Sequence, residues 1–178
     1  MARSRLLTST LVAVLAPVLA VSVVACRDEP REAETVEPDE VYLALIRWEL
    51  ARQEAAPTAS PPNSDDDEDL PVVYVAAADG SKIDTNVQAR VAHSTVDEAT
   101  LRFADSRDEA LEMDDETEPV RDGGVLLSIA LDAPDAATQR TVEVVVYRSI
   151  DDHETWLLTV DASGDSAKIT ASTLEPPS

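Results

Sequence analysis

An α+β domain is the fold class that the sequence predicts, and three observations lead to it. A segment with helical spacing of its apolar residues opens the domain, short apolar runs typical of strands follow, and four such runs succeed one another in the last third of the chain. Successive strands with short connections pair antiparallel, because parallel pairing needs a long crossover. We therefore expect an N-terminal helix, with one or two short helices, packed on a mainly antiparallel sheet of about five to six strands that ends in a four-strand meander.

The first element is a helix predicted at residues 39–53. Pro38 and Asp39 suit its first turn, where proline is tolerated and an acid complements the helix dipole. Glu49 and Arg52 argue against a helix that faces lipid. Apolar side chains cover most of its circumference, which predicts a buried position against the sheet; they are Val41, Tyr42, Leu43, Leu45, Ile46, Trp48 and Leu50.

A strand and a second helix come next. Residues 71–78 form a short continuous apolar run, which predicts a buried strand, and an Asp-Gly turn closes it. Asp84 or Thr85 can then cap a helix that extends to about His93. Two valines one turn apart mark its buried face: Val87 and Val91.

Residues 100–104 alternate between apolar and polar side chains, which predicts a half-buried strand. Ser106 and Glu109 have the spacing of a capping box, in which each side chain bonds a free backbone N–H of the first turn. We therefore expect a short helix over residues 107–113.

The predicted meander occupies the last third of the chain. Its strands are rich in β-branched residues, and they are expected at residues 124–131, 140–150, 155–160 and 167–174. Glycine-containing or acidic turns separate them, at residues 121–124, 151–154 and 161–165. The whole domain is predicted to span residues 39–174, with a tail at 175–178.

This order of elements resembles the cystatin-like and NTF2-like cones, in which a long N-terminal helix rests in a curved antiparallel sheet. The resemblance is one of topology, and no motif supports it. The domain also resembles uncharacterised bacterial secreted and lipoprotein domains, a likeness that implies no specific function.

Composition excludes several classes of function. The chain has 178 residues and a net charge of -22. A chain this acidic repels the phosphates of nucleic acids and the headgroups of anionic lipids, so neither is an expected partner. Its single cysteine excludes an intrachain disulfide and a zinc cluster built on thiolates.

Residues 1–25 have the pattern of an export signal. Arg3 and Arg5 form a basic start, and a mostly apolar run from Leu6 to Ala25 follows them. Because the basic end of such a segment stays in the cytoplasm, we expect the rest of the chain to be delivered outside.

The end of this run, Val23-Val24-Ala25-Cys26, resembles the lipobox of bacterial lipoproteins. That motif has an aliphatic residue, most often Leu, then a small or aliphatic residue, then Ala or Gly before the cysteine. The resemblance covers residues 1–26 only. It implies that Cys26 receives a diacylglyceryl group, that a lipoprotein signal peptidase cuts before it, and that lipid anchors the protein to the outer face of the bacterial cell membrane, or to the outer membrane in a Gram-negative host.

Two alternatives to lipidation stay open. The leader is long enough to just span a bilayer as an uncleaved anchor, although Pro17 suits that role poorly. Ordinary cleavage after Ala25 would instead leave Cys26 as a free thiol. All three interpretations place the domain outside the cytoplasm.

The segment between the cysteine and the domain, residues 26–38, is predicted to be a disordered acidic tether. Apart from Cys26 it is charged, poor in apolar residues and contains two prolines, so it cannot bury enough surface to offset its ordering entropy. We expect it to hold the domain away from the membrane.

Residues 54–70 form a predicted acidic loop rich in Pro and Ser. Its acids match the opening of an EF-hand calcium loop, but Leu70 and Ala76 stand where that motif requires Gly and Glu; the matching residues are Asp65, Asp67 and Asp69. A solvated run of charge is therefore the preferred interpretation, and weak cation binding by the acidic loops is a further alternative.

The sequence contains no motif of a known catalytic centre or cofactor loop, and no cofactor is expected. With Cys26 modified no thiol remains, and His93 falls at a predicted helix end. A metal site is not expected either. The weak candidates are four adjacent residues of a predicted turn, which rarely converge on one ion: Asp151, Asp152, His153 and Glu154.

We therefore predict a non-catalytic binding or accessory domain that engages an extracytoplasmic protein or a small ligand. The alternative is a ligand-binding or hydrolase-like protein of cone shape, with an apolar cavity between the first helix and the sheet. Trp48 and Trp156 are the residues expected to line that candidate pocket. An exposed sheet edge leaves the oligomeric state open.

Overall fold

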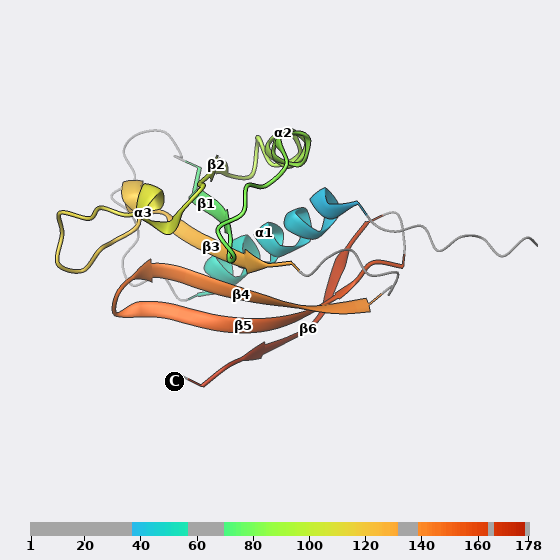
Figure 1. Cartoon of the computed structure of the whole chain (residues 1–178). Helices are drawn as coiled ribbons and strands as arrows, with labels where there is room; N and C mark the ends of the chain where they lie inside the picture. The colour runs from blue at the N-terminus through green and yellow to red at the C-terminus, as the bar shows by residue number, and fades with distance from the viewer. Residues whose placement is uncertain (1–36, 57–69, 132–138, 164–165, 177–178) are drawn as a thin grey trace, which may run out of the picture. The chain divides into compact units, whose positions relative to one another are not determined.

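A six-stranded sheet in the order β2-β1-β3-β4-β5-β6 organises the computed structural model of the chain (Figure 1). The structure describes residues 37–56, 70–131, 139–163 and 166–176, all within one of the two compact units of the chain, residues 32–178. The elements follow as α1 (Pro38–Ala55), β1 (Val72–Ala77), α2 (Thr85–Ser94), β2 (Thr100–Phe103), α3 (Arg107–Ala110), the 3-10 turn η1 (Arg121–Gly123), β3 (Val125–Ala130), β4 (Gln139–Ser149), β5 (Asp152–Asp161) and β6 (Lys168–Leu174). The predicted α+β class is confirmed.

The C-terminal meander is also confirmed, because β3, β4, β5 and β6 pair antiparallel with their neighbours in chain order. The first two strands differ from the expected pattern. β1 is parallel to both β2 and β3, so the sheet is mixed, with its parallel part at the β2 edge. The cystatin- and NTF2-like topologies expected from the order of elements have an antiparallel sheet, and the parallel pairings of β1 depart from it.

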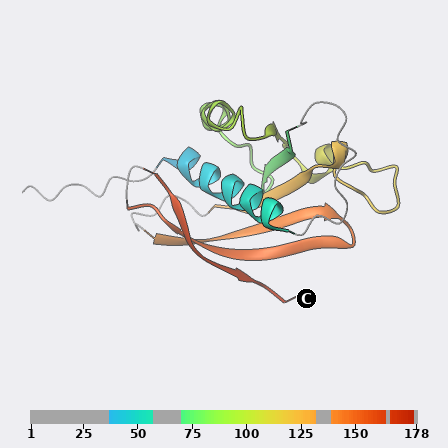
Figure 2. The same cartoon turned by 180° about the vertical axis from the view of Figure 1, so that it is seen from behind.

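Helices α1 and α2 cover one face of the sheet (Figure 2). Both begin where the sequence predicts: α1 has a proline in its first turn, and the Asp84 carboxylate caps α2 by accepting from the backbone N–H of Asn86 at 2.8 Å. The buried cluster on this face takes side chains from both helices and from alternate positions of the strands, among them Leu45, Ile46, Val91, Leu127 and Leu158.

The opposite face of the sheet is partly covered by residues 104–124, named here the covering segment, which includes α3. Tyr74, Leu126 and Tyr147 pack there against Leu111 and other residues of the segment. The prediction of a helix over 107–113 was too long, since α3 ends at Ala110. Leu111 instead forms an isolated β-bridge with the end of the covering segment, which replaces a further helical turn.

The predicted capping box of this helix does not form. Ser106 makes no side-chain cap hydrogen bond, whereas the Glu109 carboxylate accepts from the backbone N–H of Asp105 at 2.9 Å. In the described part of the chain, no helix combines the length and apolar character that a membrane crossing requires.

Candidate functional site

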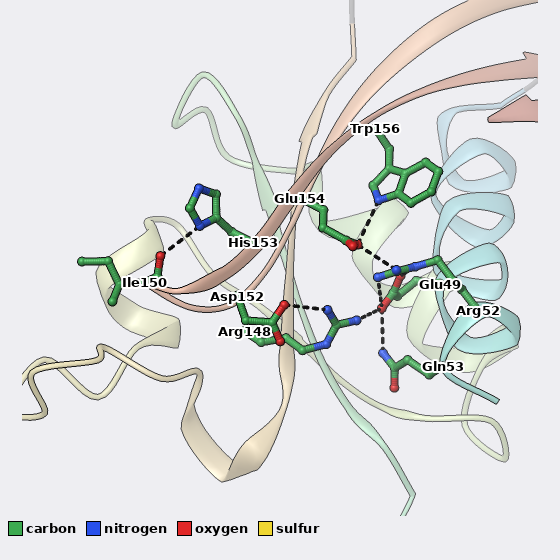
Figure 3. Close-up of polar contacts among 9 residues, drawn as sticks. All are labelled: Glu49, Arg52, Gln53, Arg148, Ile150, Asp152, His153, Glu154 and Trp156. Atoms are coloured by element: carbon green, nitrogen blue, oxygen red, sulfur yellow. Dashed lines mark hydrogen bonds and ion pairs between the residues drawn. The ribbon is translucent and has the colours of Figure 1, made fainter. Parts of the chain in front are cut away.

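A cluster of charged and aromatic side chains joins the second half of α1 to the turn between β4 and β5 (Figure 3). Helix α1 supplies Trp48, Glu49, Arg52 and Gln53. Strands β4 and β5 supply the remaining members, which are Arg148, Asp152, Glu154 and Trp156. These residues are named here the Glu49 cluster.

Glu49 is the centre of this cluster, and none of its surface is exposed. Its Oε1 accepts hydrogen bonds from Arg148 Nη2 at 2.7 Å, Gln53 Nε2 at 3.0 Å and Arg52 Nη2 at 3.3 Å. Its Oε2 accepts from Arg52 Nε at 2.8 Å. Because a buried charge is tolerated only when it is paired and hydrogen-bonded, these four donors explain how a carboxylate can occupy this position.

Arg52 links Glu49 to the tryptophan pair. Its guanidinium reaches Glu154 Oε2 through Nη1 at 2.7 Å and lies 5.7 Å from the ring centroid of Trp48 and 5.5 Å from that of Trp156. The two indoles meet edge to face, with centroids 5.3 Å apart, a favourable arrangement of aromatic rings. Trp156 also donates from Nε1 to Glu154 at 3.2 Å.

Each charged side chain of the cluster lies within 4 Å of one of opposite sign. Burial acts against the charge of Arg52, but hydrogen bonds and the charges of Glu49 and Glu154 outweigh it and raise the pKa of the guanidinium. The two carboxylates are thus occupied as hydrogen-bond acceptors for cations and an indole. This arrangement attaches α1 to the sheet. The indole and guanidinium groups are half-buried and remain partly accessible to solvent.

The two tryptophans named from the sequence are therefore brought together. The four weak metal candidates are not brought to one centre. Asp151 is an exposed turn residue, and Asp152 lies 3.6 Å from Arg148. His153 approaches the carbonyl of Ile150 with its Nδ1 at 3.0 Å and faces Tyr147, whereas Glu154 contacts Arg52 on the α1 face.

The reason is that β5 begins at Asp152, so the predicted turn at 151–154 was too long. Successive residues of a strand point to opposite faces, which separates His153 from Asp152 and Glu154. Within the described residues, no group of three or more His, Cys, Asp or Glu side chains is gathered as a metal would require. His93 is an exposed residue of the last turn of α2, as predicted.

A second polar cluster holds the covering segment on the opposite face. The hydroxyl of Tyr74 donates to Asp122 Oδ2 at 3.2 Å, and Arg102 Nη1 donates to the same oxygen at 2.6 Å. The hydroxyl of Tyr147 donates to the carbonyl of Glu118 at 3.1 Å. Glu118 and Asp122 have φ angles of 44° and 56°, a left-handed conformation that costs non-glycine residues energy. Each tyrosine thus contacts one of the two strained residues, Tyr74 the side chain of Asp122 and Tyr147 the carbonyl of Glu118.

The roles of Glu49, Arg52 and Arg148 in this cluster were not predicted from the sequence. A usable signal was the position of Glu49, three and four residues after Ile46 and Leu45, on the apolar side of the predicted helix. A carboxylate there needs a buried cation. Nothing in the sequence identified Arg148 as that cation, because it is distant along the chain. Cys26 and the acidic run with Asp65, Asp67 and Asp69 lie outside the described residues.

Comparison with known proteins finds no family model, no curated protein and no solved structure that matches this chain.

Proposed function

We propose that this protein is a bacterial lipoprotein, anchored by lipid on Cys26, whose extracytoplasmic domain is a non-catalytic binding or accessory module. The observation that carries the proposal is the position of the chain's single cysteine, directly after the apolar leader and its Val-Val-Ala end. The acidic tether at residues 26–38 would separate the domain from the bilayer.

A non-catalytic role is supported by the hydrogen bonds and ion pairs that the carboxylates of the candidate site already make with neighbouring side chains. The oxygens of Glu49 accept from four donors, and Glu154 accepts from Arg52 and Trp156. A general acid or base needs access to a substrate proton within hydrogen-bond reach. Glu49 is fully buried, so it serves the attachment of α1 better than such a reaction.

Lipidation is tested by expressing the full chain in a bacterium and measuring the mass of the membrane-extracted product. The expected mass is that of a chain beginning at Cys26 with a diacylglyceryl group and an N-terminal acyl chain or free amine. Cys26→Ala should abolish processing and lipid labelling, while Ser22→Ala in the same leader should leave both unchanged. An unmodified Cys26 at the N-terminus, or a leader that stays attached, would contradict the proposal.

A second candidate function is small-ligand binding beside Trp48 and Trp156, which is favoured by the contact of the two half-buried indoles with Arg52. A planar or apolar ligand at this position would alter indole fluorescence. Titration of metabolite mixtures against the tryptophan emission tests it, with Trp156→Phe as the variant that should lose the response. An emission spectrum unchanged by every mixture would remove this candidate.

A further inference from the structure

The two edges of the sheet differ in how they are protected. The β2 edge has only four residues and carries Arg102, and short, charged strands resist pairing with another chain. The β6 edge has seven residues, and its only charge is Lys168 at the start. Six of these seven residues are exposed, and Leu174 has half of its surface accessible. Figure 1 shows β6 at the edge of the sheet, where β5 is its only neighbour among the described strands.

The regular part of this edge is its C-terminal half. Thr159 pairs with Ala171 and Val160 with Ile169, so Thr170 is an extra residue that interrupts the register. Beyond it the pairing is regular through Leu174 opposite Trp156, and the N–H of Glu175 continues it by donating to the carbonyl of Thr155 at 2.9 Å.

The Glu175 hydrogen bond fixes which backbone groups face away from β5. In an antiparallel pair, residues alternate between those that exchange hydrogen bonds with the neighbour and those that point outward. Because Glu175 bonds to β5, Thr173 and Ala171 do so as well, and Ser172 and Leu174 present their N–H and C=O groups outward. No described strand pairs with them.

Leu174 also gives this edge an apolar contact point. It stands directly opposite Trp156 in a pair without mutual hydrogen bonds, the kind in which side chains approach most closely. Opposite residues share a face of the sheet, so Leu174 lies on the α1 side with the indole pair. A strand added to β6 would place the residue opposite Leu174 beside this apolar group.

Charge argues against a second copy of the chain and for a cationic partner. The full chain carries -22, and loss of Arg3 and Arg5 with the leader would make it more acidic, so two copies repel each other. Glu175, beside the regular half of the edge, would attract a basic residue on the opposite face of the added strand.

We infer that the β6 edge, at Ser172 and Leu174, binds an extended segment of another protein that alternates basic with apolar side chains. Main-chain hydrogen bonds to Ser172 and Leu174 would hold the segment, and an apolar side chain beside Leu174 and Trp156 would select it. The inference rests on the binding role proposed above and assigns that role a surface and a partner chemistry.

The test uses the full-length chain in detergent micelles and the synthetic peptide acetyl-Lys-Val-Lys-Phe-Lys-Val-Lys-amide. Hydrogen exchange is resolved to single amides. We expect fast exchange at Ser172 and Leu174 in the free protein and at least about tenfold slower exchange at both with saturating peptide. The same peptide with Glu in place of Lys should bind at least about tenfold more weakly.

Ser172→Pro removes one outward donor and leaves the pairing with β5 intact, so it should weaken peptide binding at least about tenfold. Ser172→Ala keeps the N–H and is the matched control. Should Ser172→Pro fail to fold, the parent chain with a peptide N-methylated at alternate amides tests the same hydrogen bonds.

Unchanged exchange at Ser172 and Leu174 with the Lys peptide, or equal binding by Ser172→Pro, would overturn the inference. Protection of the two amides without peptide that grows with protein concentration would also overturn it, by assigning the edge to a second copy. These readouts do not involve Cys26. Failure of the lipid anchor, which is read from the mass of the chain, is therefore distinguishable from failure of the β6 edge.

Discussion

Arg148 donates from Nη2 to Oε1 of Glu49 over 2.7 Å, although 99 residues separate the two along the chain. Glu49 belongs to α1, the first described element, and Arg148 to the end of β4. The contact therefore ties the N-terminal helix to the meander. Since Glu49 has no exposed surface, its charge depends on this contact and on Arg52 for compensation.

Replacing the Glu49 carboxylate should destabilise the fold strongly. Glu49→Gln leaves two partly buried guanidinium groups without their shared anion, and removing one partner of a buried ion pair is far costlier than the pair itself is stabilising. We expect the free energy of unfolding to fall by about 2–3 kcal/mol, less than for fully buried partners because Arg52 and Arg148 keep some solvent access. Urea denaturation followed by tryptophan fluorescence measures it.

Glu54→Gln is the matched control, because it makes the same chemical substitution at an exposed residue near the end of α1. It should shift the free energy of unfolding by less than about 0.5 kcal/mol. Equal effects of the two substitutions would show that the buried network does not hold α1 in place.

The strained backbone of the covering segment gives a stabilising prediction. Glu118 has a φ of 44°, and among the described residues its side chain forms one long ion pair, with Arg107 at 3.6 Å. Glu118→Gly should raise the free energy of unfolding by about 0.5–1 kcal/mol, because glycine adopts this conformation without steric cost. Its carbonyl, which accepts from Tyr147, is retained. Denaturation midpoints measure the change.

Glu118→Ala separates backbone strain from side-chain loss, since alanine removes the carboxylate and keeps the Cβ atom. It should be neutral or slightly destabilising. A gain as large as that of Glu118→Gly would mean that the acidic side chain, through repulsion by its neighbours, is the source of instability rather than the left-handed backbone.

The positions of most elements could be predicted from local pattern. The helix at 39–53 is observed as Pro38–Ala55, and Asp84 caps α2 as expected, because apolar periodicity and capping chemistry are properties of neighbouring residues. The pairing of β1 could not be predicted. A continuous apolar run indicates a strand buried on both faces, but nothing in it says that the strand will be parallel with both β2 and β3.

Tertiary contacts explain the elements whose bounds were wrong. Charged residues at 152–154 suggested a turn, yet His153 faces Tyr147 and Glu154 pairs with Arg52, so both stand in a strand. The candidate site likewise contains residues that the sequence predicted and residues that it did not. Trp48 and Trp156 were found because large aromatic side chains seek the core, whereas the partners of Glu49 depend on the register of β4 with the rest of the sheet.

Acid should remove the ion pair between α1 and the loop after α2. Hydrogen bonds from Arg47, at 2.7–3.2 Å, and its charge hold the pKa of Glu98 below its ordinary value, so the ionised form stabilises the fold. This contribution is complete above the pKa of the unfolded carboxyl, about 4.3, and is lost as pH falls through the lower pKa of the folded one.

Arg47→Met should therefore be less stable than the parent at pH 7, by less than about 1 kcal/mol because both partners are more than a third exposed and screened by solvent. The part of the difference that comes from Glu98 should disappear at about pH 2, while the hydrogen bond from Arg47 Nη2 to the carbonyl of Ser94 does not titrate and should leave a small constant difference. Denaturation curves of parent and variant across this range measure it, and a difference that stays constant with pH would exclude the ion pair as its cause.

Arg52→Lys tests whether the geometry of the guanidinium, and not only its charge, holds the Glu49 cluster. An ammonium cannot bond both oxygens of Glu49 in a planar fork while also reaching Glu154. We expect a loss of about 2 kcal/mol in the free energy of unfolding and a weaker near-ultraviolet circular dichroism signal, because the edge-to-face contact of the indoles would loosen. Arg47→Lys, in a pair exposed to solvent, should lose less than about 1 kcal/mol. If Arg52→Lys were as mild as that control, with an unchanged indole signal, charge alone would account for the role of Arg52.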